Sequence, residues 1–261
     1  MKARNRPPLL ESRAMVRMPP VPPTDADLLV RAKVAGPAPT IGPSEQRHLV
    51  EHLGASAPEA WAAMRAVYGT SPEAPMIDPE RTLGATRRAA ARIHAVAAVG
   101  GRIAFATAAP ASLLGVYSSI VRLARAAGAV VDDDQDRGPL RVDGRYPRWL
   151  RTVDGVTVVT DGSSLLATTG IDAADEWVFL VDRPALAVAD GPFAAAAYAD
   201  GVEVVTIAGL DQPALGLAAA RTLRCTLVPL HPSRPPRDYD PFVTGFAQAF
   251  TSECGRSGRA M

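Results

Sequence analysis

Short apolar runs alternate with helical segments after Gly100, and this alternation restricts the fold more than any other feature of the sequence. The runs predicted to form strands are 103–106, 129–131, 156–160, 186–189, 202–207 and 225–230. Helices are predicted between several of them, at 112–127, 192–198 and 213–223. Strands and helices at this spacing indicate parallel strands joined by right-handed crossovers. We therefore expect an α/β fold with an open, mostly parallel, doubly wound (Rossmann-like) sheet.

The first hundred residues are predicted to be mainly helical. Residues 1–23 are rich in proline and arginine, which is typical of a disordered segment. Asp78 and Pro79 are suited to begin a long helix that reaches about Val99. Asp-Gly turns in 132–154 indicate a hairpin or an excursion from the sheet edge. The predicted organisation is a lead-in at 1–23, a helical region at 24–100 that packs on the sheet, an α/β domain with a C-terminal helix at 101–250, and a flexible tail at 251–261.

Composition excludes several classes of protein. The chain has 261 residues, 48% of them hydrophobic, and a formal net charge of +1, so it can bury a core and has no charge bias toward nucleic acid. No apolar stretch approaches the ~20 residues needed to span a bilayer. The two cysteines, Cys225 and Cys254, do not make a disulfide framework. We expect a cytoplasmic protein without nucleic-acid or membrane partners, and the sequence leaves the oligomeric state open.

Standard catalytic motifs are missing from the sequence. Neither the P-loop pattern nor the glycine pattern of dinucleotide-binding folds occurs. The two cysteines lack the arginine spacing of thiol phosphatases, and Gly162-Ser163-Ser164 lacks the second glycine of a nucleophile elbow. The acidic run 132–136 is interpreted as a solvated loop, because no lysine follows Lys33 to stabilise a phosphoaspartate.

Small, hydroxyl and acidic residues follow four of the predicted strands, at 107–112, 161–164, 190–191 and 209–211. Parallel strands end on one edge of a sheet, where ligands of open α/β proteins bind, and a helix N-terminus at Ser112 would point there. We expect Asp161 and Asp190 to carry catalysis. The residues expected to bind the substrate are Thr107, Ala108, Ala109, Ser112, Ser163, Ser164, Gly191 and Asp211, with Arg31 and Lys33 as cations from the helical region.

Two interpretations of this edge remain open. In the first, the chain is an enzyme that hydrolyses a phosphate ester, and Asp161, Asp190 and Asp211 offer oxygen ligands of the kind that Mg²⁺ prefers, although the cofactor itself is not determined. In the second, the chain is a non-catalytic module that binds a small molecule or a protein. Small and acidic residues also make ordinary turns and caps, which accounts for each segment taken alone.

Five segments spread over most of the chain carry a family resemblance, namely 27–36, 77–82, 102–114, 188–190 and 239–242. Together they resemble a family of actinobacterial α/β proteins described simply as phosphatases. The resemblance implies an α/β fold and a site for a phosphorylated or other small anionic metabolite at the carboxyl ends of the strands.

The chain departs from the pattern of that family at three strand ends. Ala108 and Ala109 stand where the family pattern has Gly-His, the segment 160–164 lacks a histidine that the pattern carries, and Gly191 follows Asp190 where the pattern has His-Gly. Histidines at strand ends are natural metal ligands and acid–base groups. The resemblance therefore implies a diverged, phosphatase-like protein whose catalytic site is degraded.

Overall fold

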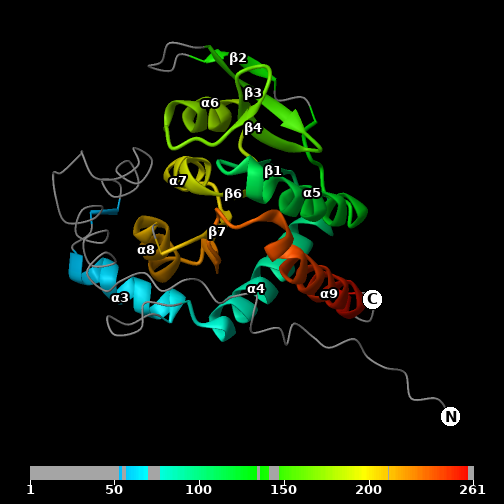
Figure 1. Cartoon of the computed structure of the whole chain (residues 1–261). Helices are drawn as coiled ribbons and strands as arrows, with labels where there is room; N and C mark the ends of the chain where they lie inside the picture. Colours follow the sequence, from blue (N-terminus) through cyan, green and yellow to red (C-terminus); the bar gives the residue numbers. More distant parts are fainter. Residues whose placement is uncertain are drawn as a thin grey trace.

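Eight strands of the computed structural model form one open sheet in the order β2-β3-β4-β1-β6-β7-β8, with β5 paired to β4 (Figure 1). The structure describes residues 53–54, 57–69, 77–133, 136–140, 147–210 and 212–257. The predicted lead-in at 1–23, the cations Arg31 and Lys33, and Asp211 lie outside the described residues. The elements are α3 (Ala57–Tyr68), α4 (Pro79–Ala97), β1 (Ile103–Ala106), α5 (Pro110–Ala126), β2 (Arg137–Leu140), β3 (Arg148–Val153), β4 (Val156–Thr160), β5 (Leu165–Leu166), α6 (Asp172–Leu180), β6 (Leu186–Ala189), α7 (Gly191–Ala199), β7 (Val204–Ala208), α8 (Pro213–Arg221), β8 (Cys225–Pro229), the 3₁₀ turn η2 (Pro236–Tyr239) and α9 (Asp240–Ser257).

The sheet is open, as expected, and it is mixed, because an antiparallel edge adjoins the parallel strands. Adjacent strands within the series β4-β1-β6-β7-β8 run parallel to one another. The pairs β2–β3, β3–β4 and β4–β5 are antiparallel. Every residue of β1, β4, β6 and β7 is buried, as expected for strands covered by helices on both faces, and this explains why they read as continuous apolar runs.

The predicted strand at 129–131 is reduced to a single bridge between Val130 and Arg102. The Val130 carbonyl accepts a hydrogen bond from Ile103 N at the beginning of β1. Further along β1, the neighbouring position is taken by β4, where Ala106 is in register with Thr157. The competition between these two segments for one side of β1 is the reason that 129–131 does not extend.

The segment 132–154 contains β2 and β3, so the hairpin alternative is confirmed. Helix α6 was not predicted from the sequence. It buries Ala173, Ala174 and Trp177, and the Trp177 ring contacts Phe193 of α7 edge-on at 5.4 Å between ring centroids. Since the apolar residues 177–180 are consecutive and do not recur at helical spacing, the amphipathic pattern is weak in the sequence.

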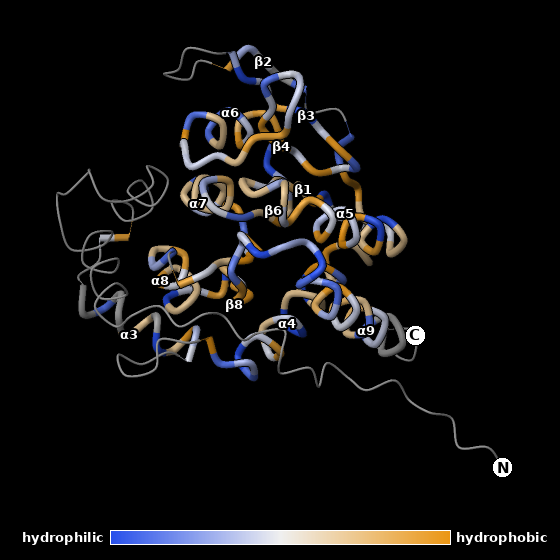
Figure 2. The backbone as a smooth tube through the Cα atoms, viewed as in Figure 1, coloured by the Kyte–Doolittle hydropathy of each residue, from blue (hydrophilic) through white to orange (hydrophobic). Residues whose placement is uncertain are grey.

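Helices cover both faces of the sheet (Figure 1). Helices α4, α5 and α9 pack together on one face, whereas α7 and α8 cover the other, with α6 packed on α7 and α3 on α8. Helix α7 is buried from Gly191 to Tyr198, and most of its residues have hydrophobic colours in Figure 2. Such all-round burial requires small side chains, which the alanines of α7 supply.

Two long helices close the face next to β8. Asp78 caps α4 by accepting a hydrogen bond from Glu80 N, as its Asp-Pro sequence predicts. On α4, the buried His94 contacts the Phe250 ring of α9 edge-on at 5.2 Å. Helix α9 continues to Ser257, so it runs past residue 251, where the sequence placed the beginning of a tail.

The Thr82 side chain ties α4 to the sheet, because its Oγ1 donates a hydrogen bond of 2.8 Å to the Pro229 carbonyl of β8. We predict that Thr82→Val lowers the free energy of unfolding by about 1–3 kcal/mol, since a buried carbonyl loses its partner. Thr86→Val is the matched control: Thr86 is equally buried, but its hydroxyl donates to the Thr82 carbonyl within α4. Chemical denaturation followed by circular dichroism should show the larger loss at Thr82, and equal losses would contradict this role.

Candidate functional site

The parallel strands bring the four predicted strand ends to one edge of the sheet, as the sequence suggested. Strand β1 lies between β4 and β6, and β7 follows β6, so 107–112 is flanked by 161–164 on one side and 190–191 on the other. In the register of β1 and β6, Ala106 pairs with Ala189. Thr107 and Ala108 therefore lie directly beside Asp190 and Gly191.

Asp190 is the buried acid of this edge. Its side chain is only 1% exposed, although it stands at the N-cap of α7. One carboxyl oxygen, Oδ2, accepts a hydrogen bond of 3.2 Å from Ala108 N. The other, Oδ1, is buried without a hydrogen-bond partner among the described residues. One oxygen is therefore fixed by β1 and the other is uncommitted.

Burial raises the pKa of Asp190 from 3.8 to about 7. The Thr107 hydroxyl, the Ala108 amide and the Tyr117 hydroxyl each favour the ionised form and limit this rise. Desolvation is the larger effect, because a charge in an apolar surrounding loses its hydration. A carboxyl group with a pKa near neutrality can donate and accept protons at physiological pH.

Gly191 is held in a conformation that suits glycine. Its φ is +54°, and a Cβ added there would lie 3.1 Å from the Ala108 Cβ. Both the backbone strain and the short contact oppose a side chain at this position. The β1 and β6 ends are therefore packed closely, and this contact is part of what buries Asp190.

The remaining predicted residues of the β1 end shape the beginning of α5. Thr107 is fully buried and its Oγ1 accepts a hydrogen bond of 3.1 Å from Ala109 N. Ala109 is the N-cap of α5 and provides no side-chain cap, and its carbonyl accepts from Ser112 N. Ser112 lies half-buried in the first turn. Hydroxyl groups and the positive end of α5 thus face the same edge as Asp190.

Asp161 belongs to a self-contained turn. Its Oδ1 accepts hydrogen bonds from Ser163 N, from Ser163 Oγ and from Ser164 N at 2.7–2.9 Å. These bonds lower the pKa of the exposed Asp161, and the one from Ser163 N has the largest effect on it. Because β1 separates β4 from β6, the backbones of Asp161 and Asp190 lie roughly 10 Å apart at two strand spacings.

These positions do not fit the Mg²⁺ site considered from the sequence. Asp161 and Asp190 use their carboxylates for a turn and for a buried contact with β1, and Asp211 is outside the described residues. Within the described ranges, no three His, Cys, Asp or Glu side chains gather closely enough to hold a metal ion. The reaction proposed below for this edge therefore uses protein side chains and water alone.

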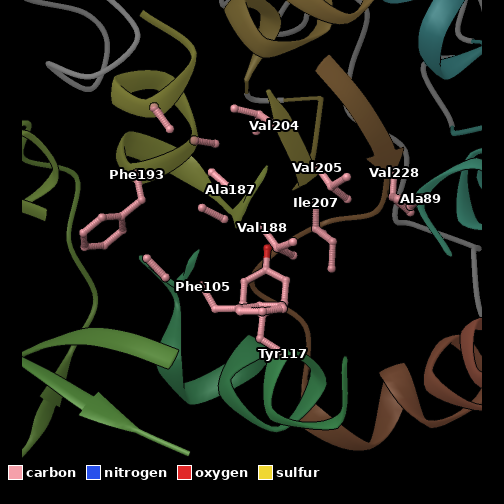
Figure 3. Packing of buried hydrophobic residues seen from close by; sticks show 14 of the residues in the cluster. Ala89, Phe105, Tyr117, Ala187, Val188, Phe193, Val204, Val205, Ile207 and Val228 are labelled. Atoms are coloured by element: carbon pink, nitrogen blue, oxygen red, sulfur yellow. The ribbon is translucent and has the colours of Figure 1, made fainter. Parts of the chain in front are cut away.

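Two tyrosines near Asp190 were not anticipated. Tyr117 of α5 is 1% exposed and its hydroxyl points toward Val188 and Ile207 of the sheet (Figure 3). Tyr239 of η2 donates a hydrogen bond to the His231 carbonyl and accepts one of 3.2 Å from Arg234 N. Their positions depend on how α5 and η2 pack, which an apolar pattern in the sequence does not reveal.

Asp190 acts on the ionisation of both phenols. Burial raises the pKa of Tyr117 well above its usual value and that of Tyr239 to about 12, and the nearby Asp190 charge raises both further. The Arg234 amide and charge oppose the rise at Tyr239. The loop that follows β8 therefore stands in the electrostatic surroundings of Asp190, with Arg234 as its half-buried cation.

The fold and this edge define an α/β protein with an ionisable buried carboxyl at the place where such sheets bind ligands. A family model described as Phosphatase matches residues 69–250, and the chain belongs to the phosphatase family. The match covers the sheet, α4 and most of α9. The resemblance deduced from the sequence is therefore confirmed.

The chain is also similar to the phosphatase SCO2771 of Streptomyces coelicolor, with 32% identity over 180 residues. That match spans 64% of this chain and 64% of the length of the relative. No solved structure matches the chain. None of the helices in the described part of the chain is both long and apolar enough to cross a membrane.

Asp190→Asn should abolish the part of the decrease in the free energy of unfolding that the ionisation of Asp190 causes as the pH rises. Because folding raises the pKa of Asp190 from 3.8 to about 7, the folded protein holds more protons than the unfolded chain between these values. The stability contributed by Asp190 is present below about pH 4 and is lost as the pH rises through 7. The wild-type free energy of unfolding minus that of the variant should fall by about 4 kcal/mol over this range.

Chemical denaturation of both proteins at a series of pH values would measure this difference, in which the contributions of all other titrating groups cancel. Two curves that stay parallel from pH about 4 to about 8 would show that Asp190 has an ordinary pKa.

Proposed function

We propose that this protein is a phosphatase-like α/β protein that binds a small phosphorylated metabolite at the carboxyl ends of its parallel strands and hydrolyses its phosphate ester. The observation that carries the proposal is the buried carboxyl of Asp190, placed at the strand end with a pKa near 7 and with one oxygen uncommitted. Membership of the phosphatase family supports the reaction class.

In this proposal Asp190 is the acid of the reaction. A water molecule attacks phosphorus, the bond from phosphorus to the alcohol oxygen breaks, and the proton of Asp190 moves to that oxygen. A proton from the attacking water then restores Asp190. A carboxyl group with a pKa near the working pH suits this exchange. The Thr107 hydroxyl and Ser112, at the beginning of α5, would contact the phosphate oxygens.

We propose Arg234 as a cation for the phosphate. Its backbone is fixed by Tyr239, whose hydroxyl binds both Arg234 N and the His231 carbonyl. Arginine binds phosphate through parallel N–H groups, which gives it more directional contacts than lysine. Arg31 and Lys33 remain predictions for the same role.

A non-catalytic binding module is the second candidate. It is favoured by the packing at the two strand ends, where Ala108 is buried and Gly191 has no room for a side chain. A histidine of the family pattern could not be accommodated at Gly191 without movement of Ala108. In this case the same edge would hold a small anionic metabolite without turning it over.

We also propose that the parallel part of the sheet is a doubly wound core, and the position of the proposed site follows from this. The parallel strands β4, β1, β6, β7 and β8 carry helices on both faces, which supports a doubly wound, Rossmann-like core with an antiparallel edge added at β2, β3 and β5. In doubly wound sheets, ligands bind outside the carboxyl ends of the strands. We propose no nucleic-acid or membrane partner.

The role of Asp190 is tested by turnover of a panel of small phosphomonoesters. Asp190→Asn should lower kcat by about a hundredfold or more, because acid–base catalysis of this kind contributes 10²–10⁴-fold. Asp200→Asn is the matched control, since Asp200 is the exposed C-cap at the other end of α7. Asp161→Asn separates the sequence prediction from the present one: a comparable loss there would make Asp161 a second catalytic group.

Turnover by the wild-type protein that survives Asp190→Asn would remove Asp190 from the reaction. Absence of turnover in the wild-type protein, together with binding of inorganic phosphate, would favour the non-catalytic module.

The role of Arg234 is tested by binding of inorganic phosphate, measured by isothermal titration calorimetry. Arg234→Gln should weaken binding by about tenfold or more, because a charge-assisted pair of hydrogen bonds is lost. Arg237→Gln, an exposed arginine three residues further along the same segment, should leave the affinity within about twofold, as expected for a distant surface charge. Equal affinities of the two variants would exclude Arg234 from the site.

A further inference from the structure

Two oxygen atoms without hydrogen-bond partners lie buried at the centre of the site. They are Oδ1 of Asp190 and the hydroxyl oxygen of Tyr117, and within the described part of the chain neither has a partner. Both side chains are 1% exposed. Buried polar atoms are almost always satisfied, so two orphans beside each other call for a physical explanation.

The Tyr117 hydroxyl stands between an acceptor and a donor. It lies close to the carboxylate of Asp190, which follows β6, and to the backbone N–H of Ile207 in β7, which lowers the pKa of the phenol. Figure 3 shows the side chain rising from α5 with its oxygen directed at the adjoining strands, next to Val188 and Ile207. A phenol has one proton to donate, and the Asp190 carboxylate is the acceptor placed to receive it.

We propose that Tyr117 is the positioning residue of Asp190 and that its hydroxyl donates a hydrogen bond to Oδ1 when Asp190 is ionised. When Asp190 is protonated, the bond between the two groups is a neutral and weaker one. The inference rests on the proposed function, in which Asp190 exchanges a proton with the substrate.

This one hydrogen bond satisfies both buried oxygens. In the ionised state it is charge-assisted and stronger than in the protonated state. Tyr117 therefore favours ionised Asp190 and offsets part of the desolvation that opposes it, in agreement with its effect on the pKa of Asp190. An acid held in this way can return to its starting state after it has given up its proton.

The other groups that face this pair come from the β1 end and from η2. Thr107 and the Ala108 amide of the β1 end contact Asp190. Tyr239 of η2 is the further titratable group whose ionisation is coupled to Asp190, and it is itself acted on by Arg234 and Asp238. A substitution confined to Tyr117 leaves all of these in place.

The test is the titration of Asp190 by ¹³C carboxyl nuclear magnetic resonance on the full chain, with the signal assigned by its loss in Asp190→Asn. In Tyr117→Phe, the midpoint should rise by about one pH unit, since the ionised form loses its stronger hydrogen bond. Tyr198→Phe, which removes the hydroxyl of another buried tyrosine near the far end of α7, should leave the midpoint unchanged. A purely structural role for Tyr117 would change stability without moving this midpoint.

A second variant keeps the test decisive if Tyr117→Phe fails to fold. Replacement of Tyr117 by 3-fluorotyrosine preserves the packing and makes the phenol a stronger donor, so the Asp190 midpoint should fall. A folded Tyr117→Phe protein or a fluorinated protein with an unchanged midpoint would overturn the proposal.

This readout is independent of turnover. If the Asp190 midpoint shifts in Tyr117→Phe but the wild-type protein has no phosphatase activity, the Tyr117 pairing is retained and hydrolysis is rejected. If turnover depends on Asp190 but the midpoint does not move, hydrolysis is retained and the Tyr117 pairing is rejected. Where turnover is present, the pH profile of kcat in Tyr117→Phe should move upward together with the carboxyl titration.

Discussion

The parallel pairing of β1 with β6 is the contact on which the site depends. These strands are separated in the chain by α5, the hairpin, β4 and α6, yet Ala106 lies in register with Ala189. The pairing places Ala108 N against Asp190 and brings Ala108 close to Gly191. Small residues at the two strand ends permit this approach, and the approach excludes water from the carboxyl group.

The burial of Asp190 lowers the stability of the folded protein when this residue is ionised, and it raises the pKa of the carboxyl group. An ionised carboxylate away from water is unfavourable, and the structure offsets only part of this with the Ala108 amide and neighbouring hydroxyl groups. The uncompensated remainder appears as a pKa near neutrality, the range that proton transfer requires. Strain and incomplete satisfaction of this kind are commonly retained at functional sites, where local rules of stability are broken.

Much of the fold could be predicted because the central strands are buried on both faces. Such strands read as short apolar runs ended by small or turn-forming residues, so the limits of β1, β4 and β6 followed from the sequence. The antiparallel pairing of β4 with β3 and β5, the loss of 129–131 and the presence of α6 did not follow. They depend on which segments compete for a neighbour and on an apolar run in α6 that lacks helical spacing.

The sequence by itself determined the family to which the chain belongs and the edge of the sheet at which the candidate site lies. It did so because turn residues after apolar runs are local signals and the strand ends of a parallel sheet share one side. Tertiary structure alone decided that Asp190 is buried while Asp161 caps an exposed turn, and that Tyr117 and Tyr239 accompany the buried acid. Burial and a shifted pKa arise from neighbours distant in the chain, so two aspartates with similar sequence settings acquire different chemistry.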